Sequence, residues 1–140
     1  MILLSLAFAI VACQQGVATD RTPGTSPEGF TAIGPDEVIR FTGTEPFWGG
    51  TIDGDELVYS TPENIDGSVI PVERFTGQGG LSFAGNLDAQ NFDLLITAGE
   101  CSDGMSDRTY PYTATLRLGN EQREGCAYTD RQPFSGPAQP

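Results

Sequence analysis

Short apolar runs separated by turn-forming residues are the feature that most restricts the fold of this chain. Between residues 37 and 130, Gly, Pro, Asn or Asp interrupts nearly every ten-residue window, so no stretch is typical of a helix. Within the runs, apolar residues recur at every second position, which is the period of a strand with one buried face. We therefore expect an all-β domain, a small antiparallel barrel or sandwich of about eight short strands. The expected strands cover residues 38–42, 47–53, 56–61, 69–75, 81–86, 91–97, 112–118 and 122–128.

Two turns and one alternating segment make this expectation specific. Asp53-Gly54-Asp55 and Gly119-Asn120 each separate two expected strands and are typical of tight hairpins. Residues 112–118 alternate between apolar and polar side chains, so one face of this strand is expected in the core and the other in solvent. The expected core-facing residues are Tyr112, Ala114, Leu116 and Leu118, and the expected solvent-facing ones are Thr113, Thr115 and Arg117.

The amino-terminal residues 1–12, MILLSLAFAIVA, are apolar except for Ser5. A helix needs about 20 residues to cross a hydrocarbon core of about 30 Å, so this run fits the apolar region of a secretory signal instead. Its end, Ile10-Val11-Ala12-Cys13, resembles the lipobox of bacterial lipoproteins. The resemblance implies that residues 1–12 are a signal peptide and that Cys13 is diacylated. Gln14 in place of Asp implies the periplasmic face of the outer membrane. An ordinary signal peptide or a buried strand is the alternative.

The rest of the chain divides by composition into three parts. Residues 13–36 are rich in Gly, Pro, Thr and Ser and show no hydrophobic period, which predicts a lipidated cysteine followed by a flexible linker. Residues 37–130 carry all the expected strands and form the predicted β-domain. Residues 131–140 contain three prolines and are predicted to be a disordered tail.

The three cysteines divide into one lipid attachment and one pair. With Cys13 lipidated, Cys101 and Cys126 remain, and an even pair in an oxidising compartment predicts a disulfide. Closing a loop of about 26 residues stabilises a fold by about 3.5 kcal/mol in the chain-entropy relation. Two buried free thiols are the alternative. A zinc site would lack half its ligands, since the chain has no His, so we expect no metal.

The charged residues exclude several classes of function. The chain has no His, its seven basic residues are all Arg, and its net charge is −12. No Ser-His or Cys-His pair and no Lys Schiff base can form, so we expect neither an enzyme of these kinds nor a cofactor. The acidic balance also argues against nucleic acid as a partner. The expected partners are the membrane, through the lipid anchor, and a periplasmic protein or a small ligand.

Two segments are denser in functional side chains than an ordinary strand or loop. They are GTEPFW at 43–48 and CSDGMSDRTYPY at 101–112. Together with TPE at 61–63, TATLRL at 113–118 and GCA at 125–127, these blocks resemble a family of uncharacterised bacterial envelope lipoproteins. The resemblance implies an envelope location and supports the cysteine pair. More distantly, the chain is similar to META-domain heat-shock lipoproteins and to membrane-bound inhibitors of C-type lysozyme. In the latter, a short loop resembling residues 106–110, SDRTY, enters the lysozyme cleft.

The candidate binding or structural cluster comes from these two segments and comprises Glu45, Phe47, Trp48, Ser102, Asp103, Met105, Asp107, Arg108 and Tyr110. Trp48, the only tryptophan, stands at a strand start and is expected to plug one end of the core, with a ligand platform as the alternative. Glu45 precedes Pro46, so its backbone is expected to be extended. Glu45 is expected to cap a turn or to pair with Arg108 rather than to act in catalysis.

The acidic residues of the second segment have two interpretations. Glu100, Asp103 and Asp107 surround a Gly as in a calcium loop, but the closing Glu and the full ligand series are missing. A structural turn is therefore expected. Ser102 and Ser106 have no base to activate them, which argues against a serine hydrolase.

Three functions follow as hypotheses. The first is a non-enzymatic, lipid-anchored periplasmic domain that binds a ligand or maintains the envelope. The second is a lysozyme inhibitor, whose acidic surface and 101–110 loop would attract a basic enzyme. The third is a cell-wall glycan hydrolase with Glu45 and Asp103 as acid and base.

Overall fold

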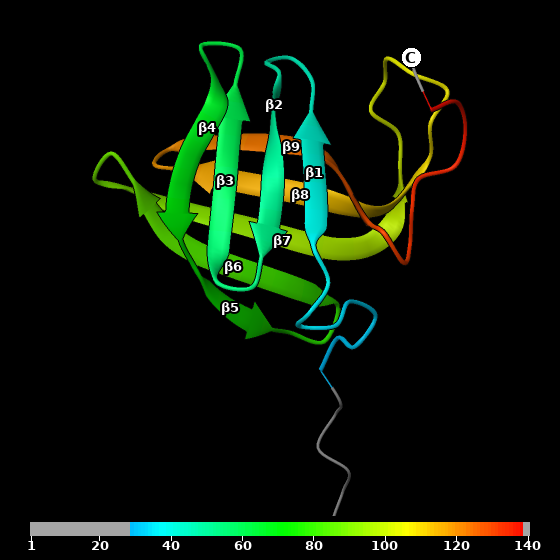
Figure 1. Cartoon of the computed structure of the whole chain (residues 1–140), viewed down its shortest axis with the longest axis horizontal. Coiled ribbons are helices and arrows are strands. Elements are labelled where there is room, and N and C mark those ends of the chain that lie inside the picture. The colour runs from blue at the N-terminus through cyan, green and yellow to red at the C-terminus, as the bar shows by residue number, and fades with distance from the viewer. Residues whose placement is uncertain (1–28, 139–140) are drawn as a thin grey trace, which may run out of the picture.

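The computed structural model describes residues 29–138, and they form an all-β domain of antiparallel strands, as the sequence predicts (Figure 1). Residues 29–138 contain no helix, and none therefore is long and apolar enough to cross a membrane. The nine strands are β1 (Ile39–Gly43), β2 (Trp48–Asp53), β3 (Glu56–Thr61), β4 (Asn64–Pro71), β5 (Glu73–Thr76), β6 (Gly80–Leu87), β7 (Gln90–Cys101), β8 (Tyr110–Leu118) and β9 (Glu121–Thr129).

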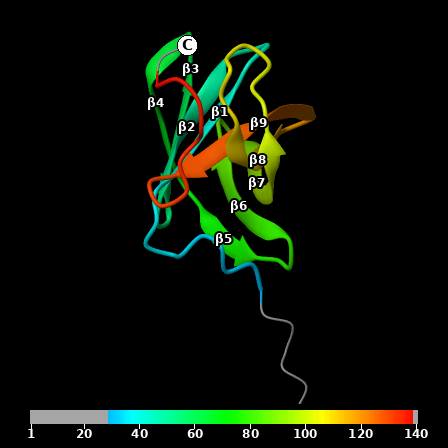
Figure 2. The ribbon, with the colours of Figure 1, turned by 90° about the vertical axis from the view of Figure 1, so that its right-hand side faces the viewer.

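The strands form one sheet that curls into a nearly closed barrel. Their order in the sheet is β4-β3-β2-β1-β9-β8-β7-β6-β5, and β1 pairs with β9 to join the two ends of the chain. Figure 1 shows β1 to β4 crossing in front of the other strands, and Figure 2 shows the two groups packed face to face. Only the consecutive strands β4 and β5 do not pair, so the barrel is open between them.

The prediction of a single strand over residues 69–75 is wrong, because the chain turns a corner within this range. β4 ends at Pro71, β5 begins two residues later, and the N–H of Val72 donates to the carbonyl oxygen of Asp55 at 2.8 Å. Ile70 and Val72 are both buried, so the alternation of burial continues through the corner. An alternating pattern therefore predicts one strand where the structure has two.

Alternating side chains fill the barrel. Tyr112, Ala114 and Leu116 of β8 are buried, whereas Arg117 is exposed, which confirms the predicted faces of this strand. Each fully buried aliphatic or aromatic side chain contributes about 1.5–3 kcal/mol to folding. The other large, fully buried residues are Ile33, Ile39, Ile52, Leu57, Ile70, Leu81, Phe83, Phe92, Leu94 and Ile96.

Trp48 belongs to the core, as expected from its place at a strand start. Its side chain is buried, and its ring lies 5.7 Å from the ring of Phe41 between centroids. Gly43 pairs with Trp48 across β1 and β2, and a Cβ on Gly43 would clash with the indole. The first and last residues of GTEPFW are therefore a packing pair.

The folded unit begins earlier than residue 37, where the β-domain was expected to start. Ile33 is only 1% exposed, and the ring of Phe30 packs edge-on against Tyr112 at 6.2 Å between centroids. The guanidinium of Arg74 donates to the carbonyl oxygen of Ile33 at 2.8 Å. Two isolated apolar residues among polar ones produce no period, so the sequence could not distinguish this segment from a linker.

Residues 131–138 also pack on the barrel, where the sequence predicted a disordered tail. The ring centroid of Phe134 lies 5.5 Å from that of Tyr110 and 5.1 Å from that of Tyr128. Ser135 and Thr109 exchange two backbone hydrogen bonds of 2.9 and 3.0 Å. This segment, which we call the C-terminal strap, covers the start of β8.

The remaining terminal predictions lie outside the described residues. They are the signal peptide 1–12, the lipidated Cys13, the linker up to residue 28 and the last two residues of the predicted tail.

Candidate functional site

A disulfide joins Cys101 at the end of β7 to Cys126 in β9, as predicted. Their Cα atoms are 5.6 Å apart, and Cys126 is fully buried. Cys101 Sγ also lies 3.3 Å from the carbonyl oxygen of Gly125. The bond fixes the start of the loop 102–109 on the outer face of the barrel.

The carboxylate of Asp103 organises this loop. It accepts hydrogen bonds from the backbone N–H groups of Met105 and Ser106 at 2.9 and 2.8 Å, and from the hydroxyls of Ser106 and Tyr110 at 2.6 and 3.3 Å. These hydrogen bonds lower the pKa of Asp103 to about 2, and the bond from the Ser106 hydroxyl has the largest effect. Burial acts in the opposite direction and raises the pKa. Asp103 therefore stabilises a turn within its own loop. No group of three potential acidic or thiol metal ligands gathers within residues 29–138.

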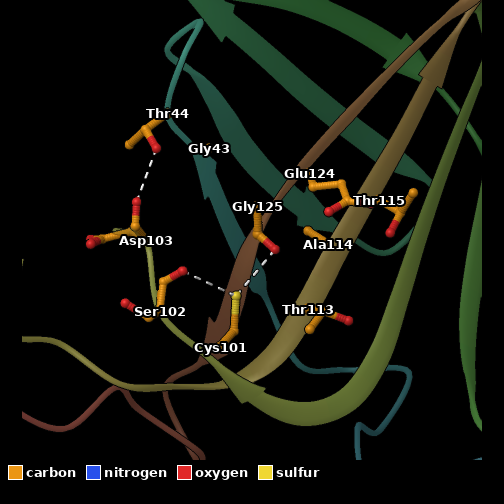
Figure 3. A pocket seen from close by; sticks show the side chains of 10 residues that line it. All are labelled: Gly43, Thr44, Cys101, Ser102, Asp103, Thr113, Ala114, Thr115, Glu124 and Gly125. Carbon is orange, nitrogen blue, oxygen red and sulfur yellow. Dashed lines mark hydrogen bonds between the residues drawn. The ribbon is translucent and has the colours of Figure 1, made fainter. Parts of the chain in front are cut away.

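A cavity of about 360 Å³ lies between this loop and the barrel wall, and we call it the disulfide cavity (Figure 3). The loop forms one wall, and the adjoining strands β1, β8 and β9 form the other. The hydroxyl of Thr44 donates to the carbonyl oxygen of Asp103 at 3.0 Å and so links the two walls. The lining residues are Gly43, Thr44, Cys101, Ser102, Asp103, Thr113, Ala114, Thr115, Glu124 and Gly125.

The chemistry of the disulfide cavity is that of hydroxyls, backbone groups and one available carboxylate. Thr113 and Thr115 are on the outward face of β8, and Thr113 shares a hydrogen bond with the hydroxyl of Thr97. Glu124 lies directly opposite Thr115 and is exposed, and its only hydrogen bond among the described residues is a 3.5 Å contact from Gln122. Because the carboxylate of Asp103 is occupied by the loop, Glu124 is the acidic group that this cavity offers to a ligand.

Arg108 and the C-terminal strap hold the far end of the loop. Arg108 Nε donates to the carbonyl oxygen of Pro137 at 2.8 Å, its guanidinium also donates to Ala138, and it stacks 4.3 Å from the ring centroid of Phe134. The sequence suggested an ion pair between Arg108 and Glu45, but Arg108 contacts the strap instead. The expectation of an extended Glu45 is also wrong, because its φ is 58°.

The structure separates the residues of the predicted cluster. Ser102 and Asp103 line the disulfide cavity, whereas Trp48 is in the core and Tyr110 packs under the strap. Glu45 and Asp107 are exposed, and Phe47 and Met105 are the exposed apolar side chains of the two loops.

The sequence interpretation missed most of the cavity lining, namely Gly43, Thr44, Thr113, Ala114, Thr115, Glu124 and Gly125, although part of it could have been found. A two-residue turn at Gly119-Asn120 fixes the register of β8 and β9, and this register places Thr115 opposite Glu124.

Comparison of the chain with protein-family models, with curated proteins and with solved structures finds no match.

Proposed function

We propose that this chain is a lipid-anchored, non-enzymatic binding domain on the periplasmic face of the outer membrane, and that its ligand occupies the disulfide cavity. The observation that carries the proposal is the cavity itself. The disulfide Cys101–Cys126 and the hydrogen bond from Thr44 to Asp103 hold a loop beside the barrel wall, and a space lined by hydroxyls, backbone groups and carboxylates remains between them.

The arrangement of the chain supports an anchor at one end and a binding site at the other. The described chain begins at Gly29 beside β5, and the loops 44–47 and 102–109 lie at the opposite end of the barrel (Figure 1). The flexible linker that the sequence predicts would let the 16 residues from 13 to 28 reach about 20–24 Å. A lipidated Cys13 would therefore leave the disulfide cavity facing the periplasm.

The positions of the two expected catalytic carboxylates favour binding over catalysis. Glycoside hydrolysis needs two carboxyl groups about 5–9.5 Å apart across a cleft, one of them protonated. Asp103, the expected base, already accepts four hydrogen bonds from its own loop and from Tyr110, so its carboxylate is not free to activate a water molecule. Glu45, the expected acid, is exposed and is not among the residues that line the cavity.

The loop geometry does not favour a lysozyme inhibitor over a small-ligand domain. An inhibitory loop must extend its basic side chain into the partner, whereas Arg108 is bound to two carbonyl groups of the strap and to Phe134. A lysozyme assay with the full chain separates the two functions, since inhibition at micromolar protein would support the inhibitor.

Membrane fractionation tests the anchor. Wild-type chain should sediment with the outer membrane, and Cys13→Ser should appear in the soluble fraction. Ser102→Ala, which leaves the lipobox intact, is the control and should remain in the membrane. Retention of Cys13→Ser in the membrane would contradict the anchor.

Ligand capture tests the cavity. The full chain, incubated with the small-molecule fraction of an envelope extract and examined by native mass spectrometry, should retain an added mass. Thr115→Tyr places a ring in the cavity and should abolish the added mass. Val69→Tyr is the matched control, because Val69 is also an outward strand residue, 61% exposed, on the distant strand β4. Equal capture by Thr115→Tyr and Val69→Tyr would contradict the proposed site.

A further inference from the structure

A second hollow adjoins the disulfide cavity on the outer face of the barrel. Its volume is about 320 Å³, and it shares Thr115 with the cavity. Its other lining residues are Ser82, Asp93, Leu94, Leu95 and Arg117. The two hollows adjoin at Thr115 of β8, and we call them together the groove; the disulfide cavity is the more polar part, and the second hollow is lined mainly by apolar surface.

Arg117 is the distinctive group of this groove. Within residues 29–138, the other five arginines are all occupied by hydrogen bonds or ion pairs, whereas Arg117 has neither. Asp93 stands directly opposite Arg117 in register, yet the two charges form no ion pair within the described part of the chain. An exposed, unoccupied guanidinium in a chain of net charge −12 is therefore available to an anionic ligand group.

Glu124 and Arg117 form a pair of opposite charges at a defined spacing. Thr115 pairs with Glu124, and Arg117 pairs with Gln122, so Glu124 and Arg117 are diagonal neighbours on one face of the hairpin. Diagonal neighbours in an antiparallel pair are about 7–8 Å apart at their backbone positions, and these two side chains form no ion pair within residues 29–138, so one ligand can reach both. Thr115 is a neighbour of both, two residues from Arg117 along β8 and directly opposite Glu124 on β9.

We propose, building on the proposed function, that the groove binds a short peptide with a free ammonium group and a free carboxylate. Its carboxylate binds Arg117, its ammonium group binds Glu124, and Thr115 contacts the amide between them. Planar, bidentate recognition of a carboxylate is the interaction that a guanidinium makes best.

The composition of the groove supports this ligand class over others. A quaternary ammonium ligand is recognised by aromatic rings, and none of the residues that line the two hollows is aromatic. A phosphate would meet two carboxylates, Asp93 and Glu124, for a single arginine, which is unfavourable for a doubly charged anion.

Calorimetric titration of the full chain in detergent tests the proposal with four probes: dialanine, its N-acetylated form, its C-amidated form and a neutral N-acetylated disaccharide. Dialanine should bind, and blocking either terminus should weaken binding by about tenfold or more, because a charged partner is left unpaired.

Two variants assign the ends of the peptide. Arg117→Gln should bind dialanine and its C-amide equally weakly, and Glu124→Gln should bind dialanine and its N-acetyl form equally weakly. Arg40→Gln, which removes an outward charge of β1 that is paired with Asp130, is the control and should bind like wild type.

The outcomes separate this inference from the proposed function. Binding of the disaccharide without dialanine, lost in Thr115→Tyr, would overturn the peptide ligand and leave the cavity as a binding site. Dialanine binding that neither variant changes would overturn the assignment of Arg117 and Glu124. Failure of all four probes to bind would overturn the peptide ligand, while capture of another molecule from the extract would still support the cavity.

Discussion

Removal of the disulfide should destabilise the domain by an amount that follows from its place in the chain. The bond joins residues 25 apart in sequence, and the chain-entropy relation for a loop of this length gives about 3.5 kcal/mol. For the roughly 110 residues that fold, this loss corresponds to a fall in melting temperature of about 15 °C. We therefore expect the double substitution Cys101→Ala with Cys126→Ala to lower the free energy of unfolding by about 3.5 kcal/mol.

Guanidinium denaturation followed by tryptophan fluorescence measures this change, because Trp48 is the only tryptophan and is buried. The wild-type chain in a thiol reductant is the matched control. The wild-type chain should be more stable than the double variant only when its disulfide is oxidised. In reductant, the two chains should unfold at the same denaturant concentration. A loss of less than about 1 kcal/mol, or a difference that persists in reductant, would refute the reasoning.

Three further substitutions test other parts of the structure. Ile33→Ala should cost about 2–5 kcal/mol by chemical denaturation if residues 29–36 belong to the core, and a neutral effect would contradict their burial. The pKa of Asp103 is lowered to about 2 from an ordinary 3.8, so its contribution is complete above pH 4 and is lost as the pH falls toward 2. Wild type should therefore lose its stability advantage over Asp103→Asn across this range in acid titrations by circular dichroism, and a constant difference would contradict that role. Phe134→Ala should release the strap and accelerate hydrogen exchange at the amides of Thr109 and Ser135, whereas unchanged protection would show that the ring is dispensable.

The hairpins were predictable because their signals are local. Gly54 and Gly119 occupy turn positions with φ of 62° and 58°, which favour glycine, and the flanking residues alternate in polarity. A two-residue turn then fixes the register of both strands without further information. The pairing of Cys101 with Cys126 was predictable for a different reason, since the chain has only two cysteines after Cys13.

The remaining features depend on contacts between distant segments, which a sequence pattern does not record. The corner at Val72 keeps the alternation of a continuous strand while changing partners from β3 to β6. The strap and the residues near Ile33 are held by contacts with parts of the barrel that are distant in sequence. The disulfide cavity combines β1, β8, β9 and a loop, so its lining follows from the order of strands in the sheet and not from any one motif.

The most direct test of the binding site is nuclear magnetic resonance of the full chain in detergent, with the captured envelope fraction as the probe. The account predicts chemical shift changes at the amides of Thr113, Thr115 and Gly125, with those of β3 and β4 unchanged, and the loss of these changes in Thr115→Tyr. Changes confined to the exposed loop residues Phe47 and Met105, or changes that persist in Thr115→Tyr, would contradict a ligand site in the disulfide cavity.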